Sequence, residues 1–271
     1  MDYFIRPGLR FDVHDSGPAE ASAVVLLHGF PQQPSSFAAV ASRLNAAGMR
    51  TLVPTQRGYA AAARPTRRRD YRTAATAADV TALLDTAGLA KAHIVGHDWG
   101  GIQAWGAAGW RPDRVASLTV LSTPHPAAFR KSLLTSRQGL VSWYIALFQL
   151  PALPERLAQR TLAKSLRDNG LPDDFADRYA AAMAEPGALT GALNWYRGIP
   201  FSAQPPLGPI TVPTTYIWGR QDIALARASA ELTADYVVGP YEAVELDAGH
   251  WLPETEPDAV ADAILARVQS T

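Results

Sequence analysis

Short apolar segments alternate with amphipathic segments along the first half of the chain. The apolar runs of strand length are residues 23–27, 49–53, 94–95 and 115–121. Between them, residues 73–87 repeat apolar side chains at helical spacing. Alternating strands and helices are typical of a parallel sheet covered by helices on both faces. The sequence therefore predicts an α/β protein with a mostly parallel sheet.

A helical block interrupts this alternation. Residues 127–206 contain helical stretches and seven prolines, without a convincing buried strand, and strand patterns return at residues 214–218 and 243–246. A helical block inserted into a parallel sheet suggests a lid over the carboxyl ends of the strands, where open α/β sheets bind ligands. We therefore expect a core domain of residues 1–126 and 207–271 and an inserted helical cap of residues 127–206.

The composition restricts the classes of partner. Lys and Arg together number 25, as do Asp and Glu, so the chain lacks the excess of cations with which proteins bind nucleic acid. There is no cysteine, which excludes disulfides and thiolate metal sites. The chain shows neither a secretory signal pattern nor an apolar run of membrane-spanning length. We expect a cytoplasmic protein with no nucleic-acid or membrane partner.

One segment has the spacing of a turn that presents a nucleophile. Gly96-His97-Asp98-Trp99-Gly100 directly follows the apolar pair at 94–95 and places an aspartate between two glycines. Such a turn joins a strand to a helix, and glycines are required because the turn packs closely against its own helix. The central residue is usually serine. Asp98 is therefore the candidate nucleophile.

Two more residues follow strands at the same predicted edge of the sheet. Asp222 comes after the strand at 214–218, and His250 comes after the strand at 243–246. Alone, an aspartate after a strand is usually a helix cap and a histidine usually makes a structural hydrogen bond. The order nucleophile, acid, histidine is that of the α/β-hydrolase fold. Together the three residues predict a catalytic triad.

Several motifs resemble those of the epoxide hydrolases of the α/β-hydrolase superfamily. They are His28-Gly29-Phe30-Pro31, Arg57-Gly58-Tyr59, Gly96-His97-Asp98-Trp99-Gly100-Gly101, Trp218-Gly219 and Gly249-His250-Trp251. The resemblance extends from about residue 10 to about residue 265, and haloalkane dehalogenases are similar and have the same aspartate. It implies the α/β-hydrolase fold and, for the reaction, neither a metal nor an organic cofactor.

An aspartate nucleophile restricts the reaction. Because a carboxylate carries its own acyl group, Asp98 would accept an alkyl group from an electrophilic saturated carbon. His250, oriented by Asp222, would activate the water that hydrolyses the resulting ester. The backbone N–H groups of Phe30 and Trp99 would form the oxyanion hole. We expect a hydrophobic epoxide as substrate and a vicinal diol as product.

The opening of an epoxide also needs a proton donor. Asn194-Trp195-Tyr196-Arg197 resembles the segment that carries a ring-opening tyrosine in epoxide hydrolases, and Trp143-Tyr144 resembles the segment with the second one. Tyr196 and Tyr144 are therefore the expected donors. The alternative is that both only pack within the lid.

The aromatic side chains of Phe30, Trp99, Trp143, Trp195 and Trp251 are expected to line an apolar substrate pocket. Two other functions stay open. In a haloalkane dehalogenase, Trp99 and either Trp143 or Trp195 would bind the halide, but the phenylalanine at position 30 offers no side-chain donor. The third possibility is a protein that binds a hydrophobic ligand without turnover.

Overall fold

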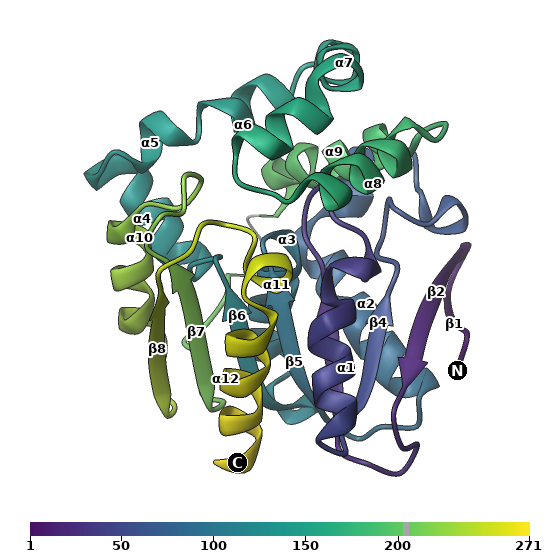
Figure 1. Ribbon diagram of the computed structural model, residues 1–271, viewed down its shortest axis with the longest axis vertical. Coiled ribbons are helices and arrows are strands. Elements are labelled where there is room, and N and C mark those ends of the chain that lie inside the picture. The colour runs from purple at the N-terminus through teal and green to yellow at the C-terminus, as the bar shows by residue number, and fades with distance from the viewer. Residues whose placement is uncertain (203–205) are drawn as a thin grey trace.

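The computed structural model describes residues 1–202 and 206–271, and these contain an eight-stranded sheet (Figure 1). The strand order is β1-β2-β4-β3-β5-β6-β7-β8. The strands are β1 (Tyr3–Arg6), β2 (Leu9–Ser16), β3 (Ala23–Leu27), β4 (Arg50–Pro54), β5 (Ala92–His97), β6 (Val115–Leu121), β7 (Thr214–Gly219) and β8 (Tyr241–Leu246). β1 and β2 pair antiparallel and all pairings from β4 to β8 are parallel, which confirms a mostly parallel sheet.

Helices cover both faces of the sheet. α1 (Ala38–Ala46) and α12 (Pro257–Gln269) lie side by side on one face, and α2 (Thr73–Thr86) and α3 (Trp99–Trp110) lie on the other (Figure 1). Alternate side chains of β3 point to opposite faces of the sheet. Val24 and Leu26 pack with α1 and α12, whereas Val25 and Leu27 pack with α2 and α3. A strand buried on both faces needs an unbroken apolar sequence, which is the pattern that identified this strand.

The helical block between β6 and β7 lies over the carboxyl ends of the parallel strands (Figure 1). Its helices are α4 (Pro126–Thr135), α5 (Gln138–Val141), α6 (Trp143–Phe148), α7 (Leu153–Asp168), α8 (Asp173–Ala184) and α9 (Ala188–Arg197). Positions 203–205, near the end of the expected cap, lie outside the described residues. Two short helices, α10 (Arg227–Glu231) and α11 (Leu252–Thr255), follow β7 and β8.

The sequence patterns did not predict β1 and β2. These strands form the antiparallel edge of the sheet, and their burial alternates, so they lack the continuous apolar runs of the central strands. None of the described helices has the length and apolar character needed to cross a membrane.

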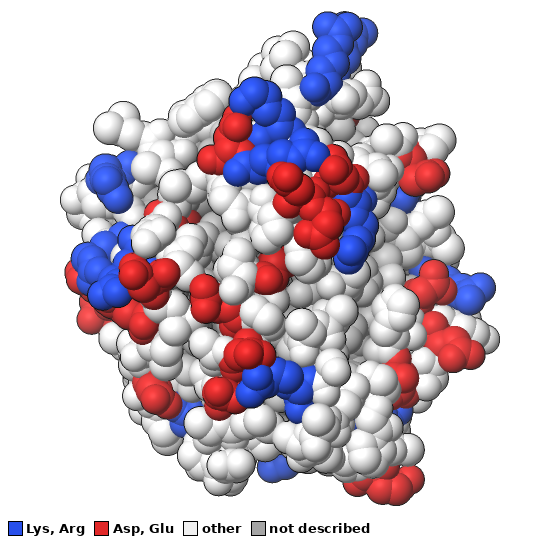
Figure 2. All heavy atoms as spheres, in the orientation of Figure 1, with Lys and Arg blue, Asp and Glu red and all other residues white. Residues whose placement is uncertain are grey.

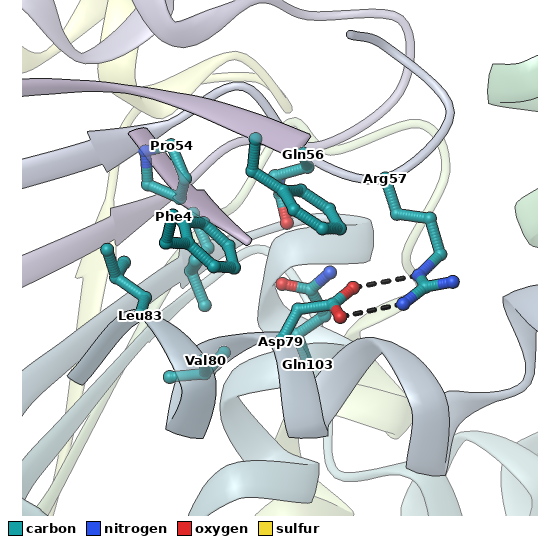
Figure 3. Close-up of a pocket in the computed structure, with 10 residues that line it drawn as sticks. Phe4, Pro54, Gln56, Arg57, Asp79, Val80, Leu83 and Gln103 are labelled. Atoms are coloured by element: carbon teal, nitrogen blue, oxygen red, sulfur yellow. Dashed lines mark hydrogen bonds and ion pairs between the residues drawn. The ribbon is translucent and has the colours of Figure 1, made fainter. Parts of the chain in front are cut away.

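The Arg57 side chain belongs to the core under β1 and β2 (Figure 3). Its guanidinium donates two hydrogen bonds to Asp79, of 2.8 and 2.7 Å, beside a cavity of about 10 Å³. The Arg57 carbonyl oxygen instead accepts a 2.7 Å hydrogen bond from the indole of Trp195 on α9. The motif at residues 57–59 therefore connects the sheet to the helical block.

Candidate active site

Asp98 lies on the turn between β5 and α3 in a backbone conformation that side chains rarely adopt, with φ 50° and ψ −120°. The turn is tightly enclosed. A Cβ atom on Gly100 would overlap the Leu27 carbonyl oxygen, and one on Gly29 would overlap the Asp98 side chain. Glycine at these two positions therefore lets β3 and its following loop approach the turn. Strain of this kind is concentrated at functional sites.

The Asp98 carboxylate faces backbone donors on one side and a histidine on the other. Its Oδ1 accepts a hydrogen bond of 2.7 Å from the backbone N–H of Phe30, and the nearby backbone N–H of Trp99 lowers the pKa of this carboxylate. Its Oδ2 lies 3.9 Å from Nε2 of His250. The two N–H groups predicted to form an oxyanion hole thus converge on the side chain of residue 98.

Asp222 and His250 form a hydrogen-bonded pair behind the nucleophile candidate. Nδ1 of His250 lies 2.8 Å from Oδ2 of Asp222. The other oxygen of Asp222 accepts backbone hydrogen bonds from Ala224 and Leu225, of 2.8 and 2.9 Å. These bonds fix the carboxylate, so that Nε2 of His250 is directed toward Asp98.

Burial and charge act in opposite directions on these groups. Burial lowers the pKa of His250, but the charge and hydrogen bond of Asp222 and the charge of Asp98 raise it more, to about 9. Burial raises the pKa of Asp98, and His250 with the two backbone N–H groups opposes this rise. Before any substrate reacts, the His250 side chain is therefore an imidazolium that lies between the carboxyl groups of Asp222 and Asp98.

Asp98 and His250 lie on the wall of a cavity of about 890 Å³ between the sheet and the helical block. Tyr144 of α6 and Tyr196 of α9 lie on the same wall, with ring centroids 6.0 Å apart. Burial raises the pKa of both phenols, and the charge of Asp98 adds to the rise. Both tyrosines are consequently protonated at neutral pH.

The five predicted pocket aromatics occupy different places. Phe30, Trp143 and Trp251 line the cavity, and Trp143 does so from its exposed rim. Trp99 and Trp195 are not among the lining residues; the Trp99 ring packs edge-to-face against Trp195 and Tyr196. Trp195 is buried and its N–H is bonded to Arg57.

A polar network that sequence reasoning missed surrounds the site. Oε1 of Gln32 accepts a hydrogen bond of 2.6 Å from the Gly29 backbone N–H. The same oxygen lies 2.8 Å from Nδ1 of His97. The other nitrogen of His97 lies 2.8 Å from the His250 carbonyl oxygen. The amide of Gln32 also donates to Glu254, at 2.7 Å.

Glu254 extends this network to the helical block. Its Oε1 also accepts a hydrogen bond of 2.8 Å from Tyr179 of α8, whereas its Oε2 is buried without a partner among the described residues. No motif identifies Gln32, Tyr179 or Glu254. The positions of Gln32 and Glu254, two residues after Phe30 and four after His250, were the only available signal.

We predict that Glu254→Gln raises stability at alkaline pH. Burial raises the pKa of Glu254 to about 7, so the ionised carboxyl destabilises the folded state above that pH, and this cost disappears as pH falls toward the unfolded value. The amide keeps an acceptor for Gln32 and Tyr179. Denaturant unfolding should show a gain of about 1–2 kcal/mol at pH 8 and almost none at pH 5. An equal gain at both pH values, or the same result for Glu256→Gln, which lacks these contacts, would contradict the assignment.

Comparisons with known proteins identify the family of the chain. Residues 22–257 match the family described as the alpha/beta hydrolase fold. The AB hydrolase superfamily protein YfhM of Bacillus subtilis is 34% identical over 95% of this chain and 94% of its own. Epoxide hydrolase A of Mycobacterium tuberculosis is 31% identical over 95% of this chain and 94% of its own. A solved epoxide hydrolase from metagenomes of hot environments is 30% identical, with a TM-score of 0.86 over 98% of this chain and 97% of that one.

The mostly parallel sheet and the helices between β6 and β7 define the class, an α/β-hydrolase with an inserted helical block. The chain belongs to the α/β-hydrolase family. Within that family, its similarity to epoxide hydrolases, expected from the sequence motifs, is confirmed.

Proposed function

We propose that the protein hydrolyses an epoxide to a vicinal diol through an ester on Asp98. One observation carries this proposal: a half-buried carboxylate, where the fold usually places a serine, faces a histidine and two tyrosines across one apolar cavity. Relatives named epoxide hydrolases support the same reaction. We further propose that residues 127–206 act as the cap that supplies both tyrosines.

In the first step, an oxygen of Asp98 attacks an epoxide carbon and the C–O bond of the ring breaks. The electron pair of that bond passes to the ring oxygen, which takes a proton from Tyr196 or Tyr144. The high pKa of each phenol keeps the proton available until the far more basic alkoxide develops. The products of this step are a neutral hydroxyalkyl ester and a phenolate, which regains a proton as His250 gives up its own.

In the second step, the ester is hydrolysed at the carboxyl carbon of Asp98. Formation of the ester removes the negative charge that helped to raise the pKa of His250. The pKa of His250 therefore falls after the first step, and the neutral imidazole can take a proton from water. The Phe30 and Trp99 N–H groups stabilise the resulting oxyanion. Its collapse breaks the ester bond between the Asp98 carboxyl carbon and the alkyl-bearing oxygen. The leaving alkoxide takes the proton held by His250, which releases the diol, and Asp98 returns to a carboxylate by giving its own proton to His250.

The haloalkane alternative has fewer donors than the sequence suggested. The Trp195 N–H is already bonded to the Arg57 carbonyl, and Trp143 is 65% exposed. A halide would therefore lack a second buried indole donor. The discriminating experiment is a panel of epoxides and haloalkanes assayed side by side for diol and halide. Diol from epoxides is expected; halide release with inert epoxides would overturn the proposal.

We predict that changing both Tyr144 and Tyr196 to Phe lowers epoxide turnover by at least about 10³-fold, because general acid catalysis of this kind contributes 10²–10⁴-fold. Each single variant should retain part of the activity. The measurement is initial-rate diol formation. Tyr216→Phe is the matched control, since the Tyr216 hydroxyl is buried outside the cavity without a hydrogen-bond partner among the described residues. Full turnover by the double variant would remove both tyrosines from this role.

A further inference from the structure

The opening of the active-site cavity is bordered by apolar side chains that face solvent. Leu140, Trp143, Leu157 and Ile223 line the cavity, and their exposed fractions are 79%, 65%, 48% and 55%. Single exposed apolar side chains are ordinary on a protein surface. A group around one opening instead marks a contact surface. We refer to these four residues, with the exposed Leu134 and Leu153 on the adjoining helices, as the cap rim.

The helices that carry most of the cap rim are strongly basic. Residues 126–168, which form α4 to α7, contain seven Lys and Arg residues but only two Asp and Glu residues, within a chain of no net charge. Both acids are paired, Glu155 with Arg197 at 2.7 Å and Asp168 with Lys164 at 2.5 Å. Lys131 and Arg167 pair with acids outside these helices. In the described part of the chain, the exposed side chains of Arg130, Arg137, Arg156 and Arg160 form no ion pair. Figure 2 shows basic side chains over α7, with acidic side chains beside them, and an isolated basic side chain among uncharged ones over α5.

Helix α7 combines both properties. Arg156, Arg160 and Lys164 recur every four residues and therefore lie on one face, next to the exposed Leu153 and Leu157. The opposite face, which includes Leu162 and Leu166, lines the cavity. A helix with interleaved basic and apolar side chains on its outer surface is suited to the boundary between lipid headgroups and acyl chains.

We propose that the cap rim docks on an anionic lipid surface. The alternative occupant, a second copy of the chain in a two-fold dimer, would place this basic surface against itself. Like charges then face each other, whereas anionic headgroups neutralise them and the apolar side chains enter the outer acyl region. The cavity opening would face the membrane, the phase in which apolar compounds accumulate.

The proposed surface contact differs from one expectation from the sequence. No membrane partner was expected because no segment could span a bilayer, but peripheral docking needs no such segment. The proposal does not depend on the reaction assigned above, because vesicle binding can be measured without turnover.

The test is co-sedimentation of the full chain with phosphatidylcholine vesicles that contain 0 to about 40% phosphatidylglycerol. Binding should increase with phosphatidylglycerol content, and added salt should weaken it because salt screens the charges. The tryptophan fluorescence of the chain should shift to the blue on binding, and Trp143→Phe should remove this shift. Arg156→Glu/Arg160→Glu should lower the partition coefficient at least about tenfold while leaving hydrolysis of a dissolved substrate unchanged.

Arg67→Glu/Arg69→Glu is the matched control, because these two exposed arginines lie outside α4 to α7 and form no ion pair among the described residues. It changes the net charge equally and should retain vesicle binding. Equal loss in both variants would reduce the effect to overall charge and overturn the proposal. Absence of vesicle binding at every phosphatidylglycerol content would also overturn the proposal. Light scattering that shows a dimer dissociated by Leu140→Ser/Leu157→Ser would assign the cap rim to a second copy of the chain.

Discussion

Asp98→Ala should lower kcat/KM for epoxide hydrolysis by at least about 10⁴-fold, which corresponds to about 5 kcal/mol of transition-state stabilisation. The size of the effect follows from covalent catalysis: without the carboxylate no ester forms, and the Tyr–His arrangement alone has no nucleophile. The fold should survive, because the substitution removes a half-buried carboxylate whose pKa is raised by desolvation. The measurements are diol formation and thermal unfolding of the same sample.

An isotope experiment separates this role from an electrostatic one. One catalytic cycle of the unmodified enzyme in heavy-oxygen water should place the label in the peptide that contains Asp98, because water attacks the carboxyl carbon of the ester. Label found only in the diol would mean that water attacks the epoxide directly. Asp98 would then be a charge near the reaction and not its nucleophile.

His250→Gln should stop the second step and spare most of the first. Gln cannot take a proton from water, so the ester on Asp98 should persist and the intact protein should gain the mass of one substrate molecule. Steady-state turnover should fall by at least about 10³-fold. The loss should be larger than for Asp222→Asn, which removes only the charge that orients and stabilises the imidazolium.

The control for this trapping experiment is the double variant Asp98→Ala/His250→Gln, which should gain no mass. A mass increase in that variant would place the alkylation on another residue. A His250→Gln variant that turns over at the normal rate would show that another group activates the water, and the two-step scheme would need a different base.

The sequence determined the core fold because its signals are local. An apolar run such as residues 23–27 is buried on both faces of the sheet. The glycines around Asp98 allow a strand to pack closely against the helix that follows it. Parallel strands share one edge, so residues that follow three different strands could be placed together before any coordinates were known. In the structure His250 does lie within hydrogen-bonding distance of Asp222 and within ion-pair distance of Asp98.

Only the tertiary structure decided which distant side chains meet. Gln32 and Glu254 are separated by 222 positions, and no periodicity links them. Trp195 looked equivalent to Trp143 in the sequence, yet one is bonded to Arg57 in the interior and the other borders the cavity opening. The antiparallel strands β1 and β2 were also missed, since edge strands need not be apolar throughout. Chain periodicity specifies which face of a strand or helix is buried, but the packing of separate elements selects the partner on that face.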